Sequence, residues 1–443
     1  MDILFWMQFA VVMLCIAFGG RLGGVGLGAA GGLGVCILVL IFGLKPGSPP
    51  IGVLLIITAV IACTSVLQGA GGLDYLVKIA EKLLRKKPNL IVFIGPLVCA
   101  TFVIFCGTSY VAFAIYPVIA EVAADAKIRP ERALSASVIA AGVGVIASPV
   151  SAAMAAMVGI LAASGVSLFN ILSISFPAYI IGILCACLSV SKRGKELEDD
   201  PEFQRRVASG EYQLLHPEAQ NAKKEYVPTK IEKVSVLLFG IGVALVILLG
   251  SVKSLLPSWN VGGEDVPLPI PSLIQMVMLA TAFFIIVFCK VPNNKFASGS
   301  VFRSGLIGVV GVFGVSWMTG TFFDNYDAFF REFFKEMVGS TPLLFGIILF
   351  GFVTVIFSPA ATVTALMPLG LSIGIPPGTL IALLPCCADF FIPGAGQIGC
   401  VSFDRTGTTK LGSFVINHSY LRPGLVLLVS ATTAGYLISK IVL

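Results

Sequence analysis

PNLIVFIGPLVCATFVIFCGTSYVAFAIYPVIAE, residues 88–121, is the stretch that decides the fold. It is almost wholly apolar, but Pro96, Gly107 and Pro117 divide it, and its second limb is far shorter than the roughly 20 residues that a spanning helix needs. We therefore interpret residues 89–120 as a re-entrant hairpin with its tip, Gly107-Thr108-Ser109-Tyr110, inside the membrane. Non-helical backbone at that depth is tolerated where it lines a cavity, and a transporter needs such a cavity.

The composition of the whole chain is that of a polytopic membrane protein. Of its 443 residues, 57% are hydrophobic and 12% are charged, and the mean hydropathy is +0.99, so no long soluble domain is left to hold a separate active site. A second kinked segment covers residues 342–370. Ten further apolar windows look long enough to span: 3–20, 24–43, 51–70, 133–163, 168–190, 234–250, 271–289, 302–321, 378–402 and 421–439.

The residues do not indicate a cofactor, a metal site or a nucleic-acid partner. The 11 cysteines lack metal-ligand spacing and are interpreted as small core residues. The two histidines, His216 and His418, are too far apart for a metal site, and His418 is expected at the membrane interface. The net charge of +6 follows from the distribution of basic loops and does not require a nucleic acid.

Basic loops give the expected topology. The linker 191–233 is rich in Lys and Arg and is placed in the cytoplasm by the positive-inside rule. Counting the spans in both directions from the linker places all but five of the 29 Lys and Arg on the cytoplasmic side. The same count places both termini on the external side. Segment 89–120 then has two cytoplasmic flanks and segment 342–370 two external flanks, which predicts two hairpins that enter from opposite faces.

The two halves also resemble each other. VIFCGTSYVAFAIYP (103–117) aligns with VIFSPAATVTALMP (355–368), and each hairpin follows an amphipathic arm, at 74–84 or 324–337. Each hairpin also precedes a helix broken by proline, within 133–163 or 378–402. We expect an inverted repeat of residues 1–190 and 234–443, all helical, because such repeats with paired broken helices point to a midplane site in a secondary transporter.

The substrate site is predicted where the two tips meet the two broken helices. Half-helix ends and free backbone N–H groups can hold an anion there without a buried cation. Hydroxyls in apolar helices also bond their own i−4 carbonyls, so that alternative stays open for each one. The predicted substrate-binding residues are Thr108, Ser109, Tyr110, Ser148, Ser151, Ser358, Thr362, Thr364, Gly394, Gly396 and Gln397.

Asp389 is the acid that lies deep in an apolar window. An intramembrane acid is a functional hypothesis by default. It is a candidate for binding a coupling proton or Na⁺ or for pairing with a substrate amino group, and a structural hydrogen-bonded role stays equally open.

A channel and an intramembrane enzyme are the alternatives to a carrier from other functional classes. The enzyme is disfavoured because no His/Asp or paired-carboxylate arrangement faces a hydroxyl.

Long motifs along nearly the whole chain resemble the anaerobic C4-dicarboxylate transporter family of the DcuA and DcuB type. The resemblance rests on GGRLGGVGLGAAGGLG, QGAGGLDYLVKIAEKLLRKKP, IRPERALSAS, IASPVSAA, DDPEFQRR, AATVTALMP and FDRTGTTKLGSFVINHSYLRPG. It implies a bacterial inner-membrane carrier that exchanges fumarate, succinate, malate and aspartate, within a superfamily of dimeric elevators with paired hairpins. It also implies a homodimer, and the linker and the FDRTGTT loop are candidates for contact with a membrane sensor kinase.

Three predicted ligand positions depart from the family pattern. The family's GTG followed by Asn or His is Gly107-Thr108-Ser109-Tyr110 here, its SQAA is Ser358-Pro359-Ala360-Ala361, and its PTYP is Pro393-Gly394-Ala395-Gly396. The preferred dicarboxylate is therefore left open, as is a carrier for a related organic anion coupled to Na⁺ or H⁺. Tyr110 and Asp389 are the expected sites of altered selectivity.

Overall fold

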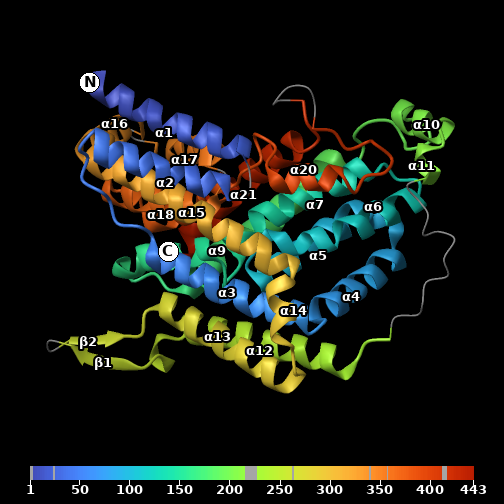
Figure 1. Cartoon of the computed structure of the whole chain (residues 1–443), viewed down its shortest axis with the longest axis horizontal. Helices are drawn as coiled ribbons and strands as arrows, with labels where there is room; N and C mark the ends of the chain where they lie inside the picture. Colours follow the sequence, from blue (N-terminus) through green and yellow to red (C-terminus); the bar gives the residue numbers. More distant parts are fainter. Residues whose placement is uncertain are drawn as a thin grey trace.

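The computed structural model describes residues 3–22, 25–214, 227–261, 264–338, 341–356, 358–411 and 417–443, and most of them are helical (Figure 1). The first half contains α1 (Ile3–Leu22), α2 (Gly26–Cys36), the π-helix η1 (Ile37–Ile41), α3 (Ile51–Gly69), α4 (Gly72–Lys86), η2 (Pro88–Leu90), α5 (Ile91–Cys106), η3 (Ser109–Ala114), α6 (Tyr116–Asp125), α7 (Pro130–Gly144), η4 (Val145–Ala147), α8 (Ala152–Leu161), η5 (Ala162–Ser164) and α9 (Leu168–Val190).

The linker contains two short helices, α10 (Pro201–Ala208) and α11 (Glu211–Leu214). The second half contains α12 (Lys230–Ser251), η7 (Lys253–Leu255), a hairpin of β1 (Ser258–Val261) and β2 (Glu264–Pro267), α13 (Ile270–Cys289), α14 (Asn293–Ser298), α15 (Ser300–Asn325), α16 (Asp327–Val338), η8 (Pro342–Leu344), α17 (Phe345–Ile356), α18 (Pro359–Ser372), α19 (Pro377–Ala382), η9 (Leu384–Cys387), α20 (Ala395–Val401) and α21 (Leu421–Val442). In the hairpin, β1 and β2 are antiparallel, with Trp259 opposite Val266.

Eight segments of the described chain are long and apolar enough to cross a membrane, which confirms a multi-pass membrane protein. They are Ile51–Gly69, Pro88–Cys106, Pro130–Ser164, Leu168–Val190, Lys230–Ser251, Ile270–Cys289, Val301–Asn325 and Leu421–Val442. The expected number of about ten is not reproduced by this criterion. Windows 3–20 and 24–43 correspond to shorter apolar helices, and window 378–402 is divided into α19, η9 and α20.

Both kinked segments double back on themselves. A Cβ on Gly95, early in α5, would lie 3.3 Å from the side chain of Ile119 in α6. Arg85, just before this segment, pairs with Glu121 near its end at 2.7 Å. In the second segment, a Cβ on Gly370, late in α18, would lie 2.8 Å from the ring of Phe345, where α17 begins. The ends of each segment therefore lie together, as expected of hairpins.

Contacts between helices in the first half have counterparts in the second half. The packing of α1 on α2 corresponds to that of α12 on α13, and the packing of α2 on α15 corresponds to that of α13 on α3. The last helix of each half, α9 and α21, pack on each other. Across the halves, α8 contacts α18 and α20 contacts η3, so the piece after each break meets the second limb of the other hairpin.

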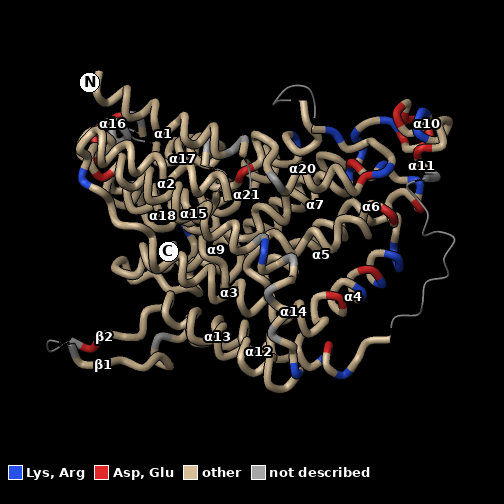
Figure 2. The backbone as a smooth tube through the Cα atoms, in the orientation of Figure 1, with Lys and Arg blue, Asp and Glu red and all other residues tan. Residues whose placement is uncertain are grey.

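The two ends of the molecule differ in their charged elements. Figure 1 shows both chain termini toward the end with α16 and the β hairpin, and α10 and α11 at the opposite end, near α4 and α6. Figure 2 shows Lys, Arg, Asp and Glu gathered over α4, α6, α10 and α11, whereas the middle of the molecule is nearly free of charge. The apolar core of the helices thus lies between two polar ends.

Candidate functional site

The first tip is a glycine turn between α5 and η3. Gly107 has a φ of +72°, in the left-handed region that residues with a Cβ rarely adopt, and it ends α5. Thr108 is extended and accepts a hydrogen bond from the Tyr110 N–H at 3.4 Å, which starts η3. Thr108, Ser109 and Tyr110 are all half-buried. The tip therefore presents polar side chains that are not sealed inside the core.

The first tip packs directly against the first broken helix. Ser148 donates to the Ile104 carbonyl at 2.7 Å, and a Cβ on Gly107 would lie 2.9 Å from the Val150 carbonyl oxygen. At the same break, Ser151 accepts from the Met154 N–H at 3.1 Å and so caps α8. The Ser151 hydroxyl also donates to the Val145 carbonyl at 2.5 Å. The hydrogen bonds of Ser151 stabilise the break, and the bond of Ser148 attaches the end of α5 to it.

The first tip also contacts the second broken helix. Tyr110 stacks on Phe113, with ring centroids 6.4 Å apart. Phe113, in η3, would lie 2.4 Å from a Cβ on Gly399 in α20, and its ring centroid is 6.3 Å from that of Phe403. The first tip therefore lies against both breaks, through Gly107 at the first and Phe113 at the second.

The second break is organised by the side chain of Gln397. Its Nε2 donates to the Asp389 carbonyl at 3.0 Å, and its Oε1 accepts from the Gly394 N–H at 3.0 Å. Gln397 is buried, whereas Asp389, Gly394 and Gly396 are half-buried. The Gln397 amide and the Gly394 N–H therefore satisfy each other here.

The second tip starts α18. Ser358 accepts from the Ala361 N–H at 3.2 Å and caps the helix. Thr362 donates to the Ser358 carbonyl at 3.0 Å and Thr364 to the Ala360 carbonyl at 2.8 Å, which are the i−4 bonds left open as the alternative. The second tip meets the first half through the packing of α18 on α8.

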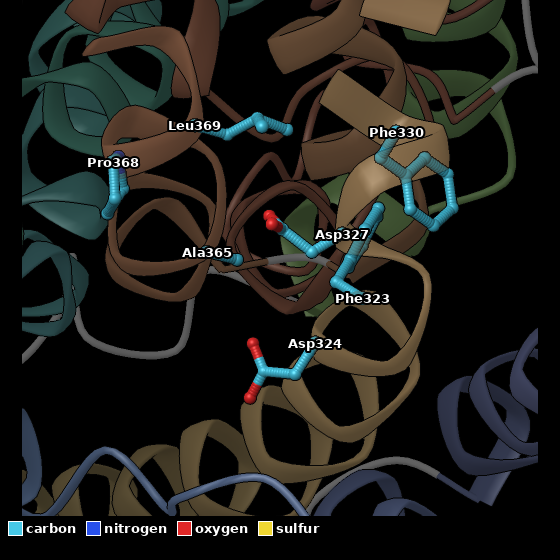
Figure 3. Close-up of a pocket in the computed structure, with 7 residues that line it drawn as sticks. All are labelled: Phe323, Asp324, Asp327, Phe330, Ala365, Pro368 and Leu369. Carbon is cyan, nitrogen blue, oxygen red and sulfur yellow. The ribbon is translucent and has the colours of Figure 1, made fainter. Parts of the chain in front are cut away.

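A cavity of about 190 Å³ lies apart from these breaks, between α18 and the junction of α15 with α16. Figure 3 shows the carboxylates of Asp324 and Asp327 pointing into the space in front of Ala365, Pro368 and Leu369. These two carboxylates would repel a dianion placed in the cavity. We therefore do not assign the dicarboxylate to this cavity.

A buried ion-pair network at the charged end was not anticipated from the sequence. The Arg129 guanidinium pairs with Glu131 at 2.6 Å and with Asp200, and all three side chains are less than a tenth exposed. Arg132 pairs with Glu196 at 3.0 Å. The linker is thereby attached to the start of α7. The sequence signal was the pair of motifs IRPER and DDPEF, but nothing in either motif identified the other as its partner.

The FDRTGTT loop belongs to the same network. Asp404 accepts from the Thr409 N–H at 2.6 Å and from the Thr408 hydroxyl at 2.9 Å. Thr408 in turn accepts from the Glu131 N–H at 3.2 Å. This loop is therefore held in place by buried hydrogen bonds and is not simply a solvated loop.

The burial of His418 inside the protein was not anticipated from the sequence. His418 is only 2% exposed, and its Nε2 lies 3.0 Å from the carbonyl oxygen of Phe391 at the second break. Tyr420 follows it and donates its hydroxyl to the Gln397 carbonyl at 2.9 Å. The neighbours of His418 in the sequence could not show that it bonds a carbonyl 27 residues away.

Comparisons with known proteins agree along the whole chain. Residues 4–443 match the family model described as anaerobic C4-dicarboxylate membrane transporter, DcuA_DcuB. The anaerobic C4-dicarboxylate transporter DcuB of Escherichia coli O157:H7 is 38% identical over 431 residues, which is 96% of both chains. The C4-dicarboxylate transporter DcuA of Wolinella succinogenes is 36% identical over 439 residues, 98% of this chain and 99% of its own.

One solved structure shares the fold. It is the YdaH transporter of Alcanivorax borkumensis, whose crystal structure is described as having an unusual topology. The TM-score is 0.51 at 15% sequence identity, and the superposition covers 98% of this chain and 97% of that one. The likeness therefore covers both halves of the chain and concerns the fold alone.

Proposed function

The chain belongs to the family of anaerobic C4-dicarboxylate membrane transporters, and on that basis we propose that it exchanges fumarate, succinate, malate and aspartate across the bacterial inner membrane by alternating access. It is a multi-pass membrane transporter and not an enzyme. The observation that carries the proposal is the packing of the first tip against both broken helices, which brings half-buried polar groups together inside an apolar molecule.

The dicarboxylate binds where these groups meet. Thr108, Ser109 and Tyr110 on the first tip supply hydroxyls, and Ser358 at the start of α18 supplies another. Backbone N–H groups at the broken helices add neutral donors, which suit a dianion that must also be released. Ser148, Ser151, Thr362, Thr364 and Gln397 shape the site through the hydrogen bonds described above, with Gly394 and Gly396 giving room at the second break.

The two halves form an inverted repeat that works as an elevator. The matched contacts between halves support the repeat, as do the two hairpins that approach from opposite ends in Figure 1. The charged end with α10 and α11 is cytoplasmic and the end with both termini is periplasmic, in keeping with the excess of basic residues near the linker. The carrier acts as a homodimer.

A second candidate is a carrier that couples the organic anion to H⁺ or Na⁺. Asp389, an acid at the second break, favours it, because an acid near a dianion site would repel the substrate unless a cation shields it. Exchange and cation coupling predict different responses to pH and Na⁺, so one assay separates them.

Counterflow in liposomes tests the proposal. Purified protein in liposomes loaded with unlabelled fumarate takes up labelled succinate or aspartate many times faster than in empty liposomes, because unpaired polar groups at the tips hinder return of the empty carrier. Uptake that ignores internal dicarboxylate would overturn exchange. A dependence on Na⁺ or on a pH gradient would favour the coupled carrier, and conductance without counterflow would indicate a channel.

A further inference from the structure

The three residues before α21, His418, Ser419 and Tyr420, form one hydrogen-bonded unit behind the second break. Each is at most 2% exposed. His418 bonds the carbonyl of Phe391 at 3.0 Å, and Tyr420 donates to the carbonyl of Gln397 at 2.9 Å. The unit therefore holds one carbonyl on each side of Pro393 and Gly394, where the helix is interrupted.

The hydrogen bonds fix the tautomer of His418. The Tyr420 N–H donates to His418 Nδ1 at 3.2 Å, so Nδ1 must be unprotonated. The ring proton of the neutral histidine then lies on Nε2, which donates to the Phe391 carbonyl. Both ring nitrogens are used, and each has a different task.

The middle residue attaches the unit to the other half of the chain. Ser419 donates to the Glu131 carboxylate at 2.7 Å, and the Arg193 guanidinium donates to the Ser419 carbonyl at 2.7 Å. The Lys410 N–H also donates to the Ser419 hydroxyl, at 2.8 Å. The unit is therefore held from behind by the start of α7, the linker and the FDRTGTT loop.

We propose that His418 and Tyr420 are positioning residues of the substrate site: His418 holds the Phe391 carbonyl away from the bound dicarboxylate, and Tyr420 anchors the start of α20 through the Gln397 carbonyl. A broken helix exposes both carbonyls and N–H groups, and only the N–H groups attract a dianion. A free carbonyl that turned toward the site would repel the substrate. Neither residue touches the substrate in this account, which rests on the proposed function.

Two substitutions of His418 separate its two hydrogen bonds. In His418→Gln, the amide NH₂ can reach the place of Nε2–H and still donate to the Phe391 carbonyl. In His418→Asn, the shorter amide oxygen replaces Nδ1 and still accepts from Tyr420, but the donor to Phe391 is lost. We expect counterflow KM for fumarate to rise roughly fivefold or more in His418→Asn and to stay near the wild-type value in His418→Gln.

Tyrosine substitutions provide a second, milder test. Tyr420→Phe removes only the hydroxyl that holds Gln397 and is expected to raise KM by a similar factor. Tyr436→Phe is the matched control on the same helix, α21, because its ring lies against Lys440, away from the break. We expect Tyr436→Phe to leave KM unchanged.

The outcomes separate this inference from the proposed function. Wild-type protein without dicarboxylate counterflow would refute the function and this inference with it. Active carriers in which His418→Asn and Tyr420→Phe keep the wild-type KM, even with a lower melting temperature, would show a purely structural role and overturn the inference alone. If His418→Asn does not fold, KM in Tyr420→Phe decides.

Discussion

Gly107 is the residue on which the shape of the first tip depends most. Its φ of +72° costs a residue with a Cβ roughly 1 kcal/mol, and a Cβ would meet the Val150 carbonyl at 2.9 Å, where backbone must shift. We expect Gly107→Ala to lower the unfolding free energy by about 1–3 kcal/mol and to reduce transport. Thermal unfolding in detergent and counterflow in liposomes measure the two effects.

Gly142→Ala is the matched control, because no atom lies within 4 Å of a Cβ at that position in α7. We expect it to preserve both stability and transport. Equal losses in the two variants would show that the tip has no special requirement for glycine.

Substitution of Asp389 distinguishes exchange alone from transport coupled to a cation. If its carboxylate binds a coupling proton or Na⁺, Asp389→Asn removes the dependence of transport on pH or Na⁺, while exchange between equal pools continues. Counterflow measured between pH 5 and 8, with and without Na⁺, gives the answer. Asp125→Asn, at an exposed acid at the end of α6, is the control. An unchanged rate and pH profile in Asp389→Asn would remove the coupling role.

At the residue scale, the sequence indicated where the breaks lie but not which polar atoms are free. The i−4 carbonyls of Thr362 and Thr364 were foreseeable acceptors, because the spacing is local. The acceptor of Ser148 and the partner of His418 lie 44 and 27 residues away, and they depend on how the helices pack. Local patterns contain no information on such distant pairs.

At the scale of elements, the linker is bound to the membrane helices by buried charges. Removing one partner of a buried pair leaves the others unpaired and costs about 3–5 kcal/mol. We expect Arg129→Ala to destabilise the carrier by about this amount, because Asp200 loses its paired cation and Glu131 keeps only the longer ion pair with Arg193, at 3.7 Å. The exposed pair of Lys127 with Glu198 is the control, since Lys127→Ala should lower the stability far less than Arg129→Ala. Similar melting temperatures for the two variants would contradict the account.

The same network has a predictable pH dependence. Burial alone would raise the pKa of Asp200, but the Phe203 N–H and the Arg129 charge outweigh it and hold that pKa below its usual value near 3.8. The stabilisation is therefore present above about pH 3.8 and is lost as the pH falls through the lower, folded-state pKa. The difference in unfolding free energy between the wild type and Arg129→Ala should therefore shrink as the pH falls below the folded-state pKa of Asp200.

Elements with a strong local signal were predicted well. The amphipathic arms at 74–84 and 324–337 correspond to α4 and α16, and the proline-containing windows are interrupted near the expected residues. The β hairpin was missed, although SWNV and EDVP flank a Gly-Gly pair that is a recognised hairpin signal. The linker contains two short helices, α10 and α11, which were not predicted from the sequence.

At the scale of the whole molecule, the account depends on two halves that meet across their breaks. Helix pairs recur between the halves, and α8 with α18 and α20 with η3 connect them. The sequence alignment of the two hairpins predicts an inverted repeat, with which these contacts are compatible. The number of spans was harder to predict, because length and hydropathy do not separate a spanning helix from a long hairpin limb such as α5.

Substrate protection of single cysteines at the two tips tests the central claim most directly. Thr108→Cys and Ser358→Cys are made in a background without the 11 native cysteines and labelled with a maleimide in proteoliposomes, with and without fumarate. Asp265→Cys, an exposed position on β2 outside the membrane-spanning segments, is the control. The account predicts that fumarate slows labelling of both tip cysteines and leaves the control unchanged, whereas protection of neither tip, or of one tip only, would contradict a site shared between them.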